Sequence, residues 1–393
     1  MSLSKSRLER LHEVLARHVA TGEVPGAVTL VSRRGEVHVD VIGAKSYGGA
    51  PLRRDSLFRI SSMSKPIAAA AALILVEECV LRLDDPVDDL LPELAGRKVL
   101  TRLDGPLEDT VDAHRAITLR DLLTFRLGFG QVIDISPDSP ILRAANERGI
   151  GMGPPNPQAY PEPDEWLRRL GELPLMAQPG EKWLYHTGAD ILGVLIARAT
   201  GKPLEALLRE RLFDPLGMKD THFSVPAEKL GRLVTSYMSP DQVFDEAEGG
   251  QWSKPAPFDS AGGGLVSTVD DYAAFAHLML NGGRHGRERI LARPTVELMT
   301  TDQLTPSQKA ISGFFPGFFD ARGWGMGVSV VTARTDVYGS PGRYGWDGGL
   351  GTTWQADPAE DLTAIMLTQR AGFPDFSPVY RDFWTGVYQS IDD

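Results

Sequence analysis

The sequence predicts an α+β fold in which the N- and C-terminal segments form an antiparallel sheet flanked by helices, with a mainly helical lobe inserted between them. Three observations support this prediction: strand patterns occupy the beginning of the chain, helical patterns fill its middle, and strand patterns return near its end. We therefore expect a discontinuous sheet domain (residues 1–60 and 310–393), a helical domain (61–309), and an active-site cleft between them.

The first segment combines a helix with a hairpin. Apolar residues recur at helical spacing over residues 8–19, and Gly22 marks the end of that helix. An apolar strand over 27–32 then leads through an Arg-Arg-Gly turn to alternating valines over 37–41. The alternation of apolar residues on either side of a turn predicts a β-hairpin.

The middle of the chain is predicted to be helical. An alanine-rich run favours a helix over residues 62–80, because alanine has the highest helix propensity. Cys79, the one cysteine, falls at the end of this helix, and we expect it to be a buried core residue. Further helices are expected at 119–125, 191–200, 204–213 and 269–280.

Two long segments interrupt this pattern. Residues 130–180 and 236–260 are rich in turn-forming residues, and we expect them to be loops that form a wall or lid of a binding site. The chain closes with strands expected at 326–332, 352–355 and 362–367 and a helix at 379–388.

Composition limits the partners of this protein. Its formal net charge is −11, so its surface repels phosphate backbones and anionic lipid, and we expect no nucleic-acid or membrane partner. The first residues show no apolar signal-peptide core, which predicts a cytoplasmic location. We expect a small-molecule ester or amide as the partner, and no oligomeric state is predicted.

No metal or cofactor is expected. The eight histidines are scattered and no His-Glu-x-x-His element occurs. The glycines at 149, 151 and 153 lie in a proline-rich segment with no strand before them, unlike a dinucleotide-binding turn.

A Ser-x-x-Lys pattern, Ser62 to Lys65, carries the candidate chemistry. Ser62 lies where an apolar extended segment meets a helix N-terminus, marked by Pro66 in the first turn. Residues three apart share one helix face, and a buried lysine loses its charge, so a neutral amine beside the hydroxyl can accept its proton. The alternative is that Ser62 and Ser64 are only capping residues and Lys65 is solvated; Ser2 to Lys5 also fits the pattern.

Five stretches occur in a fixed order: residues 58–67 around Ser-x-x-Lys, 122–129, 179–187 with Tyr185-His-Thr187, 260–268, and 344–352 with Trp346-Asp-Gly-Gly. Together they resemble the class C β-lactamase-like serine hydrolases, a group that includes penicillin-binding esterases (family VIII carboxylesterases) and D-alanyl-D-alanine peptidases. The resemblance implies a β-lactamase-like fold and an acyl-enzyme mechanism.

The resemblance also implies roles for individual residues. Ser62 matches the nucleophile, and Lys65 and Tyr185 match the general acid and base. The backbone N–H groups of Ser62 and Gly349 would form the oxyanion hole. Beside an ammonium group, we expect the pKa of the Tyr185 phenol to be lowered. Residues expected to bind substrate are Thr187, Trp346, Gly348 and Phe129, and Phe314, Phe315 and Phe318 add apolar surface.

Two positions depart from the pattern. Trp346 stands where the β-lactamases and peptidases carry Lys or His, and Thr187 stands where they carry Asn. Both changes weaken recognition of a substrate carboxylate, and Trp at the first position also occurs in esterases of the family. We therefore expect a carboxylesterase.

The sequence is also compatible with three other functions. One is a β-lactamase or D-alanyl-D-alanine peptidase of the same fold. Another is an acyltransferase that uses an acceptor other than water, and a third is an inactive sensor or scaffold. His186 follows Tyr185 directly, and because sequence neighbours usually point in different directions we expect it to be a bystander.

Overall fold

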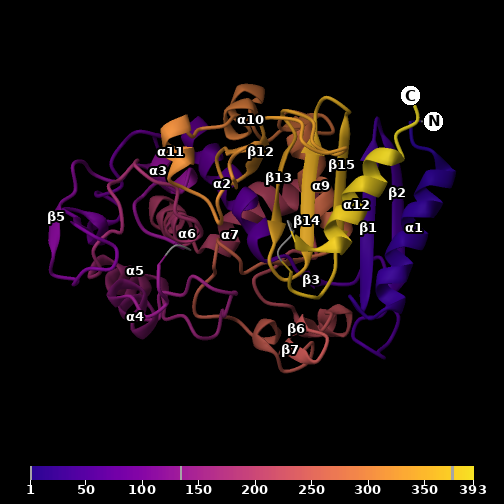
Figure 1. Cartoon of the computed structure of the whole chain (residues 1–393), viewed down its shortest axis with the longest axis horizontal. Coiled ribbons are helices and arrows are strands. Elements are labelled where there is room, and N and C mark those ends of the chain that lie inside the picture. The colour runs from indigo at the N-terminus through magenta and orange to yellow at the C-terminus, as the bar shows by residue number, and fades with distance from the viewer. Residues whose placement is uncertain (1, 133–134, 373–375) are drawn as a thin grey trace.

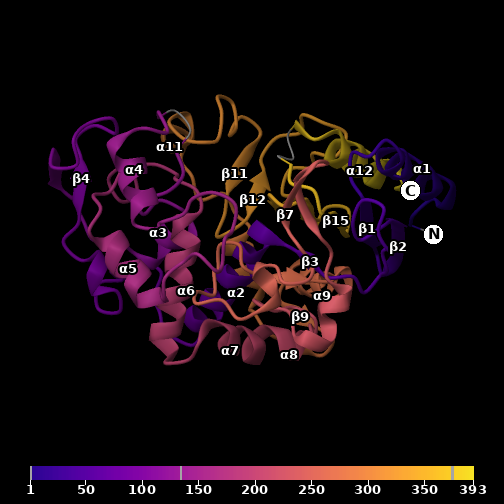
Figure 2. The same cartoon turned by 90° about the horizontal axis from the view of Figure 1, so that it is seen from below.

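A seven-stranded antiparallel sheet organises the computed structural model, which describes residues 2–132, 135–372 and 376–393. The spatial order is β11-β12-β13-β14-β15-β1-β2 (Figures 1 and 2). The strands are β1 (Gly26–Arg33), β2 (Glu36–Gly43), β11 (Arg322–Trp324), β12 (Ser329–Val331), β13 (Tyr344–Gly348), β14 (Thr352–Asp357) and β15 (Leu362–Leu367). The predicted α+β fold is confirmed.

The two ends of the chain meet inside this sheet, where β15 pairs with β1. Strand β1 pairs with β15 from Val28↔Leu367 to Arg33↔Leu362, and also forms the predicted hairpin with β2. Every residue of β1 is buried, because both of its faces are covered. The sheet thus joins the N- and C-terminal segments, while the boundaries at residues 60 and 310 stay a prediction.

Helices α1 (Lys5–Ala20) and α12 (Pro378–Gln389) cover one face of the sheet. Their apolar stripes, which include Leu11 and Phe383, pack with Val31 and Ala364 of the central strands. The backbone N–H of Ser4 donates to the carbonyl of Ser390 at 2.8 Å, so the two termini lie together (Figure 1).

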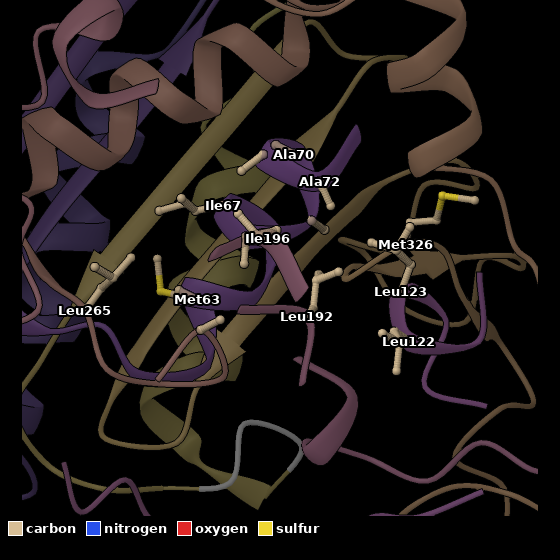
Figure 3. Close-up of a cluster of buried hydrophobic side chains, with 14 of the residues drawn as sticks. Met63, Ile67, Ala70, Ala72, Leu122, Leu123, Leu192, Ile196, Leu265 and Met326 are labelled. Atoms are coloured by element: carbon tan, nitrogen blue, oxygen red, sulfur yellow. The ribbon is translucent and has the colours of Figure 1, made fainter. Parts of the chain in front are cut away.

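The other face packs on helix α9 (Val269–Leu280), where Phe275 lies 5.6 Å from the ring of Trp354. Beyond it lies α2 (Ser64–Glu77), which is buried almost all round between the sheet, α3 (Leu119–Leu123) and α6 (Thr187–Thr200). Figure 3 shows Ile67 and Ala70 of α2 in the cluster that contains Leu192 and Ile196 of α6. This packing fixes the start of α2, where Ser62 lies.

Helices α3 to α6 gather at the end of the molecule away from the termini (Figures 1 and 2). They include α4 (Pro140–Glu147) and α5 (Pro163–Gly171), which lie in the segment predicted to be a loop over 130–180. That prediction is wrong for these residues, and residues 133–134 of the segment lie outside the described residues. The second predicted loop, 236–260, contains the paired strands β6 (Ser236–Ser239) and β7 (Gln242–Asp245).

The remaining elements are short. Helices α7 (Leu204–Leu208), α8 (Asp214–Leu216), α10 (Arg293–Met299) and α11 (Pro306–Ala310) surround the core, and a π-helical turn over Arg209–Phe213 joins α7 to α8. Three further two-stranded pairs are β3 (Phe58–Arg59) with β8 (Val266–Ser267), β4 (Lys98–Leu100) with β5 (Thr110–Asp112), and β9 (Arg284–His285) with β10 (Glu288–Arg289).

Cys79 requires a correction. It is exposed rather than buried, because α2 ends at Glu77 and the chain turns outward there, with a φ of 60° at Cys79. In the part of the chain that the structure describes, no helix is both long and apolar enough to cross a bilayer.

Candidate active site

The turn before α2 presents Ser62. A 3-10 turn over Ser61–Met63 precedes the helix, and Ser61 takes a positive φ of 47°, a strained conformation for this residue type. The Ser64 hydroxyl holds the turn by donating to the carbonyl of Ser61 at 2.7 Å and accepting from the N–H of Leu265 at 3.2 Å. Ser61, Met63 and Ser64 are buried, whereas Ser62 is partly exposed and lines a cavity.

Lys65 lies one helical turn further on and is 1% exposed. Its Nζ donates to Ser62 Oγ at 2.9 Å and to the carbonyl oxygen of Gly262 at 2.5 Å. Burial lowers the pKa of Lys65 from 10.5 to about 7, although the nearby Asp190 carboxylate opposes this shift. A substantial fraction of Lys65 is therefore uncharged at neutral pH, as a base for Ser62 requires.

Tyr185 completes the group. Its ring centroid lies 4.6 Å from Lys65 Nζ, and its hydroxyl accepts a hydrogen bond from Trp346 Nε1 at 2.5 Å. Burial raises the pKa of Tyr185 well above its usual value, and hydrogen bonds with Ser62 and Trp346 offset only part of this rise. The expected lowering of this pKa is wrong, because desolvation outweighs the hydrogen bonds that lower it.

An aromatic cluster surrounds Tyr185. Trp183, Phe314 and Trp346 lie with their ring centroids 5.5, 4.9 and 5.5 Å from the Tyr185 ring. Further members are Phe125, Phe318, Phe319 and Trp324. The cluster explains why the phenol is desolvated, and it gives the cavity an apolar wall.

The turn between β13 and β14 brings Gly349 to the same cavity as Ser62. Strand β13 lies between β12 and β14, and β12 pairs with Tyr344 and Gly345 at its start. Gly348 allows the strand to approach the Ser62 turn, because a Cβ there would lie 2.3 Å from the carbonyl oxygen of Ile60. The N–H groups of Ser62 and Gly349 thus belong to two segments in close contact.

The cavity has a volume of about 560 Å³, a size suited to a small organic ligand. Both segments predicted to be loops contribute to its wall, the first with Gln131 and residues 152–155 and the second with Met238. A buried ion pair between Asp245 of β7 and Arg59, with Nε and Oδ2 2.9 Å apart, ties the second segment to the strand that leads to Ser62.

Three of the residues predicted to bind substrate lie away from the cavity wall. Phe129 is fully buried in the main core, where it packs with the helices. Thr187 is 1% exposed at the start of α6, and the Cα of Gly348 faces the carbonyl of Ile60 rather than the cavity. Trp346, Phe314 and Phe318 do line the cavity, whereas Phe315 packs beside the aromatic cluster.

His186 and Asp190 are site residues that the sequence reasoning missed. His186 lines the cavity with its Nδ1 3.3 Å from Lys65 Nζ, so the expectation that it is a bystander is wrong. Asp190 is 2% exposed and lies behind it. The spacing of four residues at a helix start places two side chains on one face, and this signal was available in the sequence.

The described residues contain no group of three or more His, Cys, Asp or Glu side chains arranged to hold a metal ion.

Comparison with known proteins identifies the family to which the chain belongs. A family model described as Beta-lactamase matches residues 11–383, and the chain belongs to that family. It is a serine hydrolase with the β-lactamase-like fold, and its relatives include esterases and acyltransferases.

Individual relatives cover almost the whole chain. Protein Rv1367c of Mycobacterium tuberculosis is 40% identical over 365 residues, which span 91% of this chain and 88% of that protein. Esterase EstB of Burkholderia gladioli is 31% identical over 394 residues, or 92% and 90% of the two chains. The structure of EstCE1, a hydrolase with promiscuous acyltransferase activity, superposes with a TM-score of 0.78 at 24% identity and covers 98% of this chain and 99% of that one.

Proposed function

We propose that this protein hydrolyses carboxylic esters through an acyl-enzyme on Ser62. The observation that carries the proposal is the 2.9 Å contact between Ser62 Oγ and the buried amine of Lys65, whose pKa is lowered to about 7. An uncharged amine at hydrogen-bond distance from a serine hydroxyl is a suitable general base.

In acylation, Lys65 accepts the hydroxyl proton while Ser62 Oγ bonds to the ester carbonyl carbon. The oxygen of the tetrahedral intermediate takes the negative charge beside the N–H groups of Ser62 and Gly349. The carbon–oxygen bond to the alcohol then breaks, and the ammonium of Lys65 together with the Tyr185 hydroxyl supplies the proton that the alcohol carries away.

In deacylation, the same groups act in reverse. Lys65 takes a proton from water, the resulting hydroxide bonds to the acyl carbon, and the bond to Ser62 Oγ breaks. The proton returns to Ser62 and the acid leaves. Because burial keeps the Tyr185 phenol protonated at neutral pH, we assign the base to Lys65 and hydrogen-bond donation to Tyr185.

The cavity wall favours esters with an apolar group. Phe314, Phe318 and Trp346 line it, and Trp346 presents an uncharged ring where the β-lactamases and peptidases that the sequence resembles carry Lys or His. The esterase relatives support the same substrate class. We therefore propose a preference for apolar esters over β-lactams and over peptides with a free carboxylate.

A panel of p-nitrophenyl esters of increasing acyl length, assayed beside the cephalosporin nitrocefin, tests this proposal. We expect kcat/KM to rise with acyl length and to exceed the value for nitrocefin, and Ser62→Ala to abolish turnover. A higher kcat/KM for nitrocefin would indicate a β-lactamase. Ester products formed with an added alcohol in preference to hydrolysis would indicate an acyltransferase, and no turnover of any substrate would indicate an inactive scaffold. A cytoplasmic location stays a prediction, which cell fractionation tests.

A further inference from the structure

His186 and Asp190 form a buried pair directly behind Lys65. His186 Nδ1 lies 3.3 Å from Lys65 Nζ, and its Nε2 lies 3.2 Å from Asp190 Oδ2. The other carboxylate oxygen, Oδ1, accepts from Ser260 Oγ at 2.7 Å and from the N–H of Gly262 at 2.8 Å. Asp190 therefore contacts both His186 and Gly262, two of the groups that face the amine of Lys65 together with Ser62 and the Tyr185 ring.

The backbone supports a specific role for His186. Its φ of 82° and ψ of −65°, with the N–H of Thr187 donating to the carbonyl of Tyr185 at 3.2 Å, form a strained γ-turn. This turn directs the neighbouring side chains of Tyr185 and His186 toward the same amine. Strain of this kind persists where the surrounding structure enforces it, and it concentrates at functional sites.

The protonation of the pair follows from its charges. Burial alone would raise the pKa of Asp190, but the neighbouring His186 ring and hydrogen bonds from Ser260 and Gly262 bring it below its usual value, so the carboxylate is ionised and can only accept. Burial, and then the charge of Lys65, lower the pKa of His186, so the ring is neutral. The ring proton therefore lies on Nε2, facing Asp190, and Nδ1 is left as an acceptor.

We infer that His186, oriented by Asp190, is a positioning residue that directs the lone pair of Lys65 toward Ser62. A neutral amine has two N–H groups and one lone pair. In the neutral amine, the carbonyl of Gly262 and His186 Nδ1 accept the two N–H groups, so the lone pair points to the third neighbour. That neighbour is the Ser62 hydroxyl, which accepts from the charged ammonium and donates to the neutral amine. This inference rests on the proposed acyl-enzyme function and names a residue that the function alone does not require.

The test compares His186→Leu, which removes the acceptor, with His186→Asn, which keeps a polar side chain of similar reach. For His186→Leu we expect kcat to fall about 100-fold, the cost of misplacing a reacting group by about 1 Å, with KM little changed. The acid limb of the pH profile should move to lower pH, because the ammonium form loses an acceptor. His186→Asn should recover a large part of kcat.

The other titratable groups near Lys65 are unchanged in these variants: Asp190 and Tyr185 remain, as does Tyr160, whose pKa is raised by burial and then by Asp190. His277→Asn is the matched control. His277 is also a partly buried histidine, and it lies on α9, away from the cavity. Its Nε2 is 2.9 Å from the Oγ of Ser32 on β1. This variant should leave kcat and the acid limb unchanged.

A second measurement reads the protonation of His186 in the wild-type protein. Nitrogen-15 NMR of histidine-labelled wild-type protein, assigned with His186→Asn, should show a neutral His186 with its proton on Nε2 at pH 8. A proton on Nδ1, or a His186→Leu protein with wild-type kcat and acid limb, would overturn the inference. Failure of the proposed function is distinguishable, because the wild-type enzyme would then lack esterase activity and Ser62 would not be labelled by a fluorophosphonate.

Discussion

The indole N–H of Trp346 donates a 2.5 Å hydrogen bond to the hydroxyl of Tyr185, which joins β13 to the start of α6 across the cavity. In the β-lactamases and peptidases that the sequence resembles, this position carries Lys or His for the substrate carboxylate. Here the side chain instead restrains a residue proposed to handle protons. We therefore expect Trp346 to affect both the substrate preference and the position of the Tyr185 hydroxyl.

Replacement of Trp346 and Tyr185 by phenylalanine tests this relationship. Tyr185→Phe should lower kcat by at least about 100-fold, the low end for a positioned acid–base group. Trp346→Phe should lower it about tenfold, the effect of one hydrogen bond of about 1.4 kcal/mol. In the double variant, Trp346→Phe should add little, because its donor acts through the missing hydroxyl. Steady-state kinetics with one p-nitrophenyl ester measures all three, and independent, multiplying effects would contradict the account.

The pH dependence of kcat/KM should follow Lys65. The amine must be uncharged to accept the Ser62 proton, so activity should rise through a pKa of about 7 and be lost below it. Burial raises the pKa of Tyr185, so loss of activity at alkaline pH should begin well above neutral pH. A profile measured with a non-ionising ester checks this, and a flat profile across neutral pH would show that Lys65 is not the base.

Lys65 should also destabilise the folded protein in a pH-dependent way. Its pKa falls from 10.5 unfolded to about 7 folded, so the unfolded state binds more protons between these values and the penalty diminishes as pH rises. Lys65→Met removes this penalty, so its unfolding free energy should exceed that of the wild type. This gain should be larger at pH 6 than at pH 9.5 by about 3 kcal/mol. Urea unfolding at the two pH values measures the difference. An equal effect at both would mean that the lysine is not desolvated.

Gly348 should be required for the geometry between β13 and the Ser62 turn. A Cβ at this position would lie 2.3 Å from the carbonyl oxygen of Ile60, so Gly348→Ala must push Gly349 away from Ser62. We expect kcat to fall about 100-fold, with a smaller effect on KM. Gly231→Ala is the control, because no atom lies within 4 Å of its added Cβ. Wild-type kcat in Gly348→Ala would contradict the proposed oxyanion hole.

The sequence patterns predicted the main secondary structure elements of the molecule. The spacing of residues along the chain predicted the β1–β2 hairpin, helix α12 and the approach of Lys65 to Ser62. All three are present in the structure, because each depends mainly on neighbours in the sequence. Helices α4 and α5 were missed because they are short and lie among prolines, although Pro140 and Pro163 at their first turns are start signals.

The second layer of the site was harder to predict. Whether His186 faces Lys65 depends on the strained γ-turn at His186. The residue types around His186 do not predict the backbone dihedral angles of this turn. Phe129 follows Gly128, whose φ is 97°, and the chain turns its ring into the core, a direction set by tertiary packing. The pKa of Tyr185 depends on an aromatic cluster drawn from distant segments, which no local pattern displays.

Reaction of the protein with a fluorophosphonate, followed by intact mass spectrometry and peptide mapping, tests the central claim most directly. The account predicts one adduct on Ser62, formed faster at pH 8 than at pH 6, since deprotonation of Lys65 activates the hydroxyl. Ser62→Ala should form no adduct and Lys65→Met should react far more slowly. An adduct on another residue, or labelling of Ser62 at the same rate in Lys65→Met, would contradict it.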